Sequence, residues 1–247
     1  MLLNEKTAIS TSKVLLVPYS KWHVPRYHEW MKDEEIQEAT ASEPLSIEEE
    51  YAMQQSWRND ADKLTFIICL PLSTTLNDNH GDVAKGIKLD GESDSPARMI
   101  GDINLFLRID DGEEGTSSPE IIGEIELMIA EKKDQRRGFG KAALLSFLRY
   151  VAGNEQEIVR EFLKGEGDGK GKLKERKFDA LSVKIGEKNE RSLKLFGSVG
   201  FEKVGESPNY FGEWELRRTR FDVEGVEQEM EGAVVQEYRE VVYEREE

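Results

Sequence analysis

The residues best suited to chemistry in this chain lie in the stretch 134–150, DQRRGFGKAALLSFLRY. Three cations and two glycines stand where an amphipathic helix is predicted to begin: Arg136, Arg137, Gly138, Gly140 and Lys141. The first N–H groups of a helix have no partner within the helix, and the helix dipole places partial positive charge there. Because glycine lets the main chain approach an anion closely, this pattern is typical of a phosphate-binding turn. An ordinary strand-to-helix turn with solvated cations is the alternative.

Two glutamates precede this turn in an apolar run, IIGEIELMIA at 121–130, that is predicted to be a buried strand. Glu124 and Glu126 share one face of it, because side chains alternate along a strand. A carboxyl group with a pKa of about 4.3 is a poor base near neutral pH, but burial would raise that pKa toward a useful value. The two side chains are therefore candidate general bases. The alternatives are that the two carboxylates are merely solvated, or that they bind the cationic group of a substrate.

The hydrophobic pattern along the chain predicts the elements that position these residues. Strands are predicted at 13–19, 63–70, 98–109, 121–130 and 178–185, and helices at 22–39, 46–57, 139–151 and 189–201. A capping box of Ser46 and Glu49 begins the second helix. The segments 203–207 and 213–220 suggest a further hairpin. The order β-α-α-β-β-β-α-β-α-β-β indicates a mixed α/β domain.

Three segments differ in composition from this pattern. Residues 71–97 are rich in Asn, Asp, Gly, Ser and Pro, which predicts a surface insertion. Residues 164–177 are rich in Gly and Lys but lack the P-loop pattern, and we interpret 154–177 as a second insertion. The acidic segment 222–247 is predicted to be a loosely held or partly disordered tail. The expected organisation is one domain at 1–221 followed by this tail.

The overall composition narrows the class of function. A net charge of −16 argues against non-specific binding to nucleic acid or to anionic membranes, and it suits a cationic or neutral acceptor. A single cysteine excludes an internal disulfide and a Cys-based zinc site, and His23, His28 and His80 show no metal-ligand spacing, so we expect no metal. The sequence shows no signal-peptide pattern and no apolar run of about 18 residues, so a cytoplasmic location is expected by default.

Two known motifs compete for the glycines. Gly138-x-Gly140-x-x-Ala143 nearly fits the dinucleotide-binding fingerprint, in which the first glycine follows its strand almost directly. Here a basic loop intervenes after Ala130, and the next predicted strand lies beyond the 154–177 insertion. The dinucleotide interpretation is therefore the weaker one.

The stretch 135–140, QRRGFG, resembles the Q/R-x-x-G-x-G/A signature of the GNAT acyltransferase superfamily, and Asn189-x-x-Ser192-x-x-Leu195-Phe196-x-x-x-Gly200-Phe201 is similar to its second conserved block. The predicted element order also resembles that fold over about residues 10–221. Residues 14–66 and 123–131 closely resemble the N-acetyltransferase 9-like branch. The resemblance implies a GNAT-type fold, with a central mixed, mostly antiparallel twisted sheet flanked by helices.

The resemblance also implies acetyl-CoA as co-substrate. Its pyrophosphate would lie on the amides of the turn, and its pantetheine arm would follow the 121–130 strand, with an N–H near Met128 facing the thioester carbonyl and a bulge in that strand. The implied cofactor-binding residues are Leu127, Met128, Ile129, Ala130, Gln135, Arg136, Arg137, Gly138, Phe139, Gly140, Lys141, Asn189 and Phe196.

The same resemblance favours Glu124 over Glu126 as the base, because Glu124 falls where related histone-type acetyltransferases keep a catalytic glutamate. Glu126 would then be a second acid group or would bind the acceptor's ammonium. Many relatives have a tyrosine at the position of Phe196, where its hydroxyl can protonate the departing CoA thiolate. Phenylalanine has no such proton, so either solvent protonates the thiolate or catalysis is weak.

These observations lead to two hypotheses. In the first, the protein is an acetyl-CoA-dependent N-acetyltransferase acting on a protein amine. An α-amine is favoured, because its pKa of about 7.7–8.0 leaves a usable neutral fraction, whereas that of a lysine is about 10.4. The branch resemblance points to tubulin or another cytoskeletal protein as acceptor. In the second, the protein is a weakly catalytic acetyl-CoA-binding adaptor of a cytoskeletal partner, a reading motivated by Phe196 and the acidic tail.

Overall fold

The computed structural model describes residues 1–40, 42–72, 89, 91–111, 119–167 and 176–244, whose strands join in one sheet. The strands are β1 (Thr7–Ser10), β2 (Leu15–Pro18), β3 (Lys63–Cys69), β4 (Met99–Asp110), β5 (Glu120–Ile129), β6 (Ala180–Gly186), β7 (Glu202–Lys203), β8 (Glu213–Arg218) and β9 (Arg239–Val242). Their order in this nine-stranded sheet is β7-β8-β6-β5-β4-β3-β2-β1-β9. Within the described residues β5 and β6 are the one parallel pair, and the other neighbours are antiparallel. The mixed, mostly antiparallel sheet expected from the sequence is confirmed.

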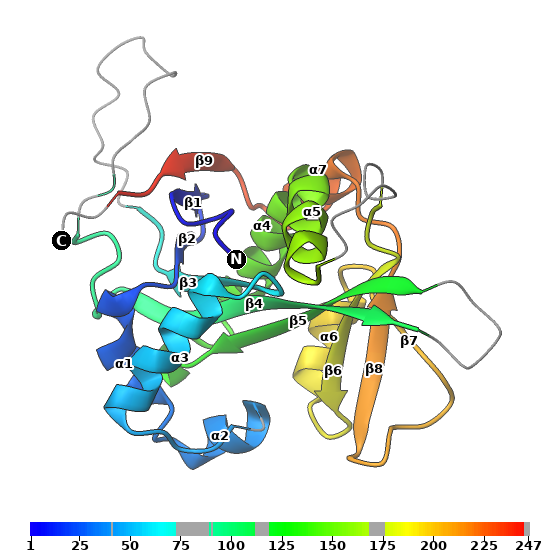
Figure 1. Cartoon of the computed structure of the whole chain (residues 1–247), viewed down its shortest axis with the longest axis horizontal. Helices are drawn as coiled ribbons and strands as arrows, with labels where there is room; N and C mark the ends of the chain where they lie inside the picture. Colours follow the sequence, from blue (N-terminus) through cyan, green and yellow to red (C-terminus); the bar gives the residue numbers. More distant parts are fainter. Residues whose placement is uncertain (41, 73–88, 90, 112–118, 168–175, 245–247) are drawn as a thin grey trace, which may run out of the picture.

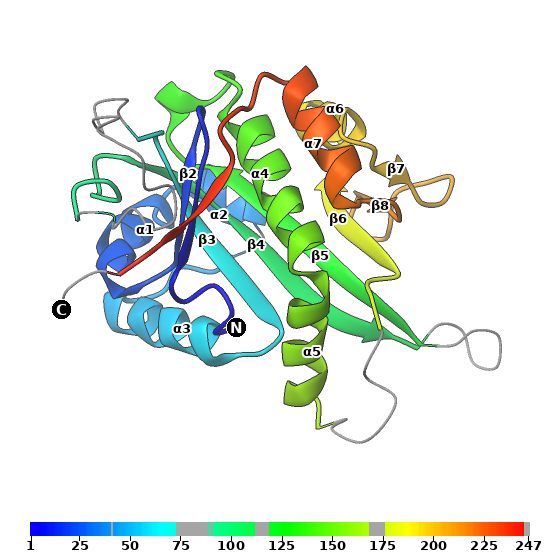
Figure 2. The same cartoon turned by 90° about the horizontal axis from the view of Figure 1, so that it is seen from above.

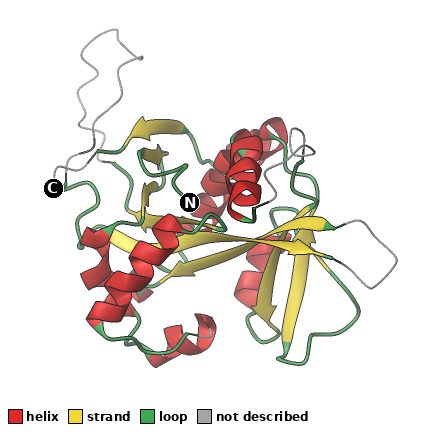
Figure 3. Ribbon diagram, viewed as in Figure 1, coloured by secondary structure: helices red, strands yellow, loops and turns green. Residues whose placement is uncertain are grey.

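Helices cover both faces of this sheet, as Figure 1 and Figure 3 show from one side and Figure 2 from above. The helices are α1 (Val24–Trp30), α2 (Glu34–Thr40), α3 (Ile47–Asn59), α4 (Phe139–Gly153), α5 (Glu155–Gly165), α6 (Glu190–Gly197) and α7 (Val223–Gly232). α4, α5 and α7 share one hydrophobic core with the sheet. α1 and α3 pack against a second, smaller core on the opposite face. The central strands are therefore buried on both sides.

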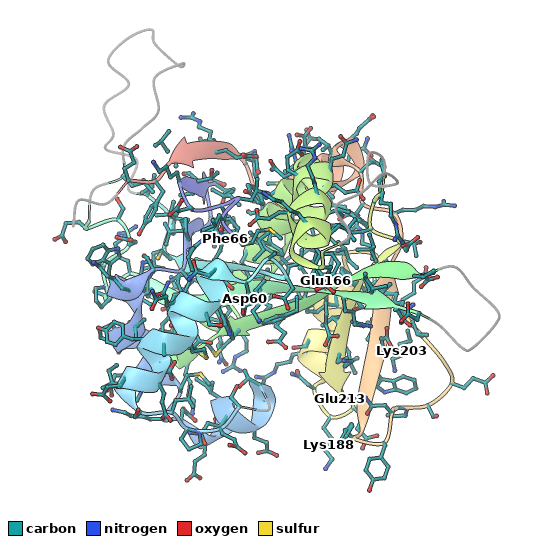
Figure 4. All side chains as sticks on the ribbon, in the orientation of Figure 1. Asp60, Phe66, Glu166, Lys188, Lys203 and Glu213 are labelled. Atoms are coloured by element: carbon teal, nitrogen blue, oxygen red, sulfur yellow. The ribbon has the colours of Figure 1, made fainter. Side chains whose placement is uncertain are left out.

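Alternation along β3 shows how one strand serves both cores. Phe66 points to the α4 side, where its ring centroid lies 6.0 Å from that of Phe147 and 5.3 Å from that of Tyr150 (Figure 4). Ile67 and Cys69 point the other way, into the core beneath α1. A strand buried on both faces reads as a continuous apolar run, which is why TFIICL lacks alternation in the sequence. Cys69 is a buried free thiol in this core.

The predicted helix at 22–39 is divided in the structure. A short 3-10 turn at Lys21–His23 leads into α1, and α2 begins only at Glu34. Asp33 causes the break: its carboxylate accepts a hydrogen bond from the main-chain N–H of Glu35 at 2.9 Å. Asp favours such a local bond at a turn over a position inside a helix. The capping box of α3 is confirmed, with Ser46 and Glu49 each accepting from the other's main-chain N–H.

The second predicted insertion and the predicted tail both contain ordered elements. α5 lies inside the expected 154–177 insertion and buries Ile158, Val159, Phe162 and Leu163. The expected acidic tail forms α7, which packs on α4, and β9, which pairs with β1. Arg218 holds α7 with two hydrogen bonds to Glu229, at 2.9 and 3.0 Å. Most of the predicted insertion at 71–97 and the centre of the Gly/Lys segment lie outside the described residues.

Gly101 provides a direct test of the β4–β5 pairing. A Cβ at this position would lie 1.9 Å from the main-chain oxygen of Met128, and neither strand can move without breaking the ladder. We expect Gly101→Ala to lower the free energy of unfolding by about 3 kcal/mol or more. The control is Gly186→Ala at the end of β6, where an added Cβ meets nothing within 4 Å and the expected change is under about 0.5 kcal/mol. Equal urea midpoints for the two variants would contradict this packing.

Candidate active site

The sheet divides where β5 and β6 part. These two strands pair only from Ile122↔Ala180 to Glu124↔Ser182, although β5 continues to Ile129 and β6 to Gly186. Beyond that point β5 stays paired with β4, and β6 stays paired with β8. Figure 1 shows the resulting divergence. The inner edge of β5 is therefore left without a strand partner after Glu124.

Main-chain groups alternate along this open edge. The carbonyl oxygen of Met128 lies against Gly101 of β4, and the N–H of Ala130 bonds the Ile100 oxygen at 2.9 Å. The alternation of a strand then turns the main-chain groups of Leu127 and Ile129 toward the open edge. The main-chain N–H that could face the thioester carbonyl therefore belongs to a residue next to Met128 and not to Met128 itself. From Glu120 to Ile129 the β4–β5 register runs without a shift, so along this stretch the divergence comes from β6 turning away. Directly after it, the N–H groups of Ala130 and Glu131 both donate to the Ile100 oxygen, at 2.9 and 3.3 Å, which is the hydrogen-bond pattern of a bulge.

The basic loop after β5 forms the predicted turn at the start of α4. Gly138 is the N-cap residue and has a left-handed conformation with φ 85°, where an added Cβ would meet nothing within 4 Å. The first main-chain bond of the helix runs from the Ala142 N–H to the Gly138 oxygen at 3.0 Å. The N–H groups of residues 139–141 therefore have no acceptor within the helix. Gln135 closes the turn onto β5, with its amide donating to the Ile129 oxygen at 2.9 Å.

The three cations of this turn are not equivalent. Arg137 donates to the buried carboxylate of Asp134 at 2.6 Å, and its guanidinium lies 5.1 Å from the ring centre of Phe139. Arg136, which is exposed with φ 62°, and Lys141 have no ion pair within the described part of the chain. Arg136 and Lys141 are therefore the side chains with charge available to an anion at this helix end.

Gly140 gives the first turn of α4 its close contact with the open strand edge. An added Cβ would lie 3.7 Å from side-chain atoms of both Ile129 and Leu195, and 3.9 Å from Leu127. The helix start, the exposed end of β5 and α6 therefore meet at this glycine.

Glu124 lies at the point where the two strands separate and is held by two cations. Arg108 of β4 donates to its carboxylate at 2.9 Å, and Lys184 of β6 donates to the same oxygen at 3.0 Å. The Glu124 carboxylate is therefore engaged in two ion pairs, one from each neighbouring strand.

Glu126 lies two residues further along β5 and has a different environment. Its carboxylate makes no ion pair with any described residue, and the residue is exposed to solvent although neighbouring protein atoms surround part of it. The pKa of Glu126 is raised to about 7, first because surrounding protein atoms desolvate it, and then because Asp102 and Glu124 add negative charge. Lys184 opposes this rise. A carboxyl group with a pKa near neutrality is suited to general base catalysis.

The sequence analysis missed the polar residues of β4 that lie beside Glu126. Asn104 is its direct cross-strand partner, and Asp102 follows on the same face. The Asn104 amide donates to Asp102 at 2.8 Å, and the Tyr27 hydroxyl donates to the same oxygen at 3.4 Å. The signal was present in RMIGDINLFLRI, where two polar residues at alternate positions interrupt an otherwise apolar strand.

The second motif lies on α6. Asn189 is the N-cap residue, and its side-chain oxygen accepts from the Ser192 N–H at 3.1 Å, while its amide nitrogen is left for other contacts. Phe196 is only 3% exposed, and its ring centroid lies 5.1 Å from that of Phe201. This phenylalanine is therefore a core residue in the structure.

Two negative findings apply to the described ranges. No group of three or more His, Cys, Asp or Glu side chains there is arranged to hold a metal ion. None of the helices in the same part of the chain combines the length and apolar character needed to cross a membrane.

Comparison with known proteins supports the same family as the turn and the fold. The family model for the GNAT acetyltransferase domain matches residues 13–202. An N-acetyltransferase 9-like protein of Schizosaccharomyces pombe is 38% identical over 239 residues, covering 89% of this chain and 99% of that protein. The human α/β-tubulin N-acetyltransferase 9 is 42% identical over 220 residues, covering 89% of this chain and 86% of that protein.

Solved structures share the fold at low sequence identity. Spermidine N-acetyltransferase from Vibrio cholerae, in complex with CoA and spermine, has a TM-score of 0.53 and 14% identity, and the match covers 83% of this chain and 94% of that one. An aminoglycoside acetyltransferase in complex with coenzyme A has a TM-score of 0.51 and 14% identity, covering 89% and 98%. Since the family model spans most of the sequence and the relatives align over nearly their full length, this chain belongs to the N-acetyltransferase 9-like branch of the GNAT acetyltransferases.

Proposed function

We propose that this N-acetyltransferase uses acetyl-CoA and transfers the acetyl group to the N-terminal α-amine of a protein, with tubulin as the acceptor. The observation that carries the proposal is the position of Glu126. This carboxyl group, with a pKa of about 7, lies on the strand whose edge opens at Glu124 and which leads into the α4 turn. A proton acceptor and an anion-binding helix end thus belong to one continuous segment.

The α4 turn would hold the pyrophosphate of acetyl-CoA. The N–H groups of residues 139–141 are unpaired within the helix, and Arg136 and Lys141 add charge beside them. The pantetheine amides would bond the main-chain groups of Leu127 and the N–H of Ile129, whose oxygen already accepts from Gln135, and Asn189 would offer its amide nitrogen from α6. The solved structures of the same fold that contain coenzyme A support this choice of co-substrate.

Glu126 would remove a proton from the acceptor ammonium group. The neutral amine then attacks the thioester carbonyl, the C–N bond forms, and the C–S bond breaks as the tetrahedral oxyanion collapses. The nitrogen of the tetrahedral intermediate gives its remaining extra proton to solvent, and the CoA sulfur leaves as a thiolate. Because Phe196 is a buried hydrocarbon ring, solvent would protonate the thiolate, whose pKa should lie near that of a cysteine, about 8.5.

The preferred class of acceptor amine follows from the proton affinity of the amine itself. Moving a proton from an α-ammonium group with a pKa of about 7.7–8.0 to a base with a pKa of about 7 costs about 1 kcal/mol. The same transfer from a lysine with a pKa of about 10.4 costs about 5 kcal/mol. The α-amine is therefore the better match. The names of the human and Drosophila melanogaster relatives, which specify α/β-tubulin, support tubulin as the protein that carries it.

Two matched peptides with a tubulin N-terminal sequence test this proposal. One has a free α-amine and no lysine, and the other has a blocked α-amine and one internal lysine. After incubation with enzyme and acetyl-CoA, mass spectrometry should find an added acetyl group on the first peptide alone. Transfer to lysine alone would overturn the α-amine proposal. Binding of acetyl-CoA with no transfer to either peptide or to whole tubulin would favour the adaptor hypothesis.

A further inference from the structure

Two carboxyl groups lie close together on the face of the sheet that carries Glu126. Glu126 is paired in register with Asn104, and Asp102 is paired with Met128. Asp102 and Glu126 are thus diagonal neighbours on adjacent strands, a relation in which Cβ atoms lie about 7–8 Å apart or somewhat less. Side chains at such positions can interact across the sheet.

Asp102 is held by neutral groups. Its side-chain partners are the Asn104 amide and the Tyr27 hydroxyl, and it makes no ion pair with any described residue. It is 3% exposed, so solvent does not screen its charge either. Glu124, by contrast, has Arg108 and Lys184 against its carboxylate. The negative charge of Asp102 is therefore uncompensated.

Other titratable groups also face this pair. Glu124 and Lys184 act on Glu126 with opposite signs. Tyr27 from α1 and Tyr19 lie on the Asp102 side, and both are influenced by the buried Glu50 of α3. The Nδ1 atom of His28 lies 3.8 Å from the Glu50 carboxylate. Among the carboxyl groups, Asp102 is the one with the largest effect on Glu126.

Hydrogen bonding favours the ionised form of Asp102. Burial raises its pKa to about 6, while the hydrogen bonds from Asn104 and Tyr27 act to lower that pKa. When Asp102 is ionised, its charge opposes the ionisation of Glu126. Asn104 adds a second effect, because its side-chain oxygen is buried without a hydrogen-bond partner in the described chain. A protonated Glu126 would find an acceptor in the residue directly opposite.

We propose that Asp102 is a positioning residue for acetyl transfer, whose uncompensated charge, held in place by Asn104 and Tyr27, makes Glu126 a strong enough proton acceptor for the incoming amine. The proposal rests on the role of Glu126 proposed above. Asp102 would act through Glu126 and not on the acceptor itself.

The test is a direct titration of Glu126 in the full chain. Protein labelled with 13C at the glutamate carboxyl groups is titrated by NMR, and the Glu126 signal is assigned by its absence in Glu126→Gln. In Asp102→Asn, which keeps the shape and a hydrogen-bond acceptor for Asn104, the midpoint should fall by about 0.5–1 pH unit, or about three- to tenfold in proton affinity. The acid limb of kcat/KM should move by the same amount, and kcat should fall.

Two further variants separate this effect from a general loss of structure. Glu50→Gln removes another buried carboxyl group from the same side of the sheet and should leave the Glu126 midpoint unchanged. Tyr27→Phe removes the hydroxyl that favours ionised Asp102, so the midpoint should fall, but less than in Asp102→Asn. An unchanged midpoint in folded Asp102→Asn, or an equal shift in Glu50→Gln, would overturn the proposal. The titration needs no acceptor, so a shifted midpoint in a protein without transferase activity would refute the proposed function and still support the coupling of the two carboxyl groups.

Discussion

Replacing Gly138 with aspartate is expected to weaken acetyl-CoA binding at least about a hundredfold, or by about 3 kcal/mol. An added Cβ here meets no protein atom within 4 Å, so the new carboxylate would stand in the space before the first turn of α4. There it would repel the pyrophosphate that the free N–H groups of residues 139–141 are proposed to bind. Calorimetric titration with acetyl-CoA measures the effect.

Gly205 offers a matched control for backbone strain. It too is left-handed, with φ 80° against 85° for Gly138, and an added Cβ there also meets nothing within 4 Å. Gly205→Asp should therefore lose similar stability while keeping its affinity for acetyl-CoA. Equal losses of binding in both variants would mean that strain, and not the anion site, explains the result. Binding of a nicotinamide dinucleotide in place of acetyl-CoA would restore the dinucleotide interpretation of the glycines.

Glu126→Gln should reduce kcat by about 10²–10⁴-fold, the usual contribution of a general base. In the parent enzyme kcat/KM should rise with pH through about 7, because only the deprotonated carboxylate can accept a proton. The variant should lose the limb set by Glu126 and keep only the rise set by the acceptor's own ammonium group, with a pKa of about 7.7–8.0, while its KM for acetyl-CoA changes little. Initial rates from pH 5 to 9, about two units either side of that midpoint, test both expectations.

Glu124→Gln is the natural comparison, because Glu124 shares the strand and face of Glu126. It breaks the contacts to Arg108 and Lys184, so a loss of stability and a moderate fall in rate are expected. The acid limb of the pH profile should remain. A lost acid limb in Glu124→Gln, with a normal profile in Glu126→Gln, would return the role of base to Glu124, as the sequence resemblance suggested.

Local signals in the sequence located much of the fold. The capping box at Ser46 marked the start of α3, and the glycines marked the start of α4. α5 and α7 were missed for a different reason. Their apolar residues form a stripe on helices that are otherwise charged, and the neighbouring Gly/Lys and Glu-rich segments dominated the composition. Contacts with α4 decide these helices, and no short stretch of sequence shows such contacts.

The candidate site likewise has one part that the local sequence predicts and another that depends on contacts between distant segments. The turn at Gly138 could be found from residue types alone, because its function depends on main-chain geometry that only glycine adopts easily. The choice between Glu124 and Glu126 could not be made from residue types alone. It depends on Arg108 and Lys184, which belong to neighbouring strands and are distant in sequence from both glutamates. The effect of Asp102 likewise requires the β4–β5 register.

The pairing of β9 with β1 has a consequence for how the chain is made. β1 leaves the ribosome well before its outer neighbour, residues 239–242, has been synthesised. Throughout that interval the outer edge of β1 has no partner from its own chain, and an unpaired strand edge can recruit a strand from another molecule. Contacts between such distant segments also form slowly. The period between synthesis of β1 and arrival of β9 is thus the time at which the nascent protein most needs protection from aggregation.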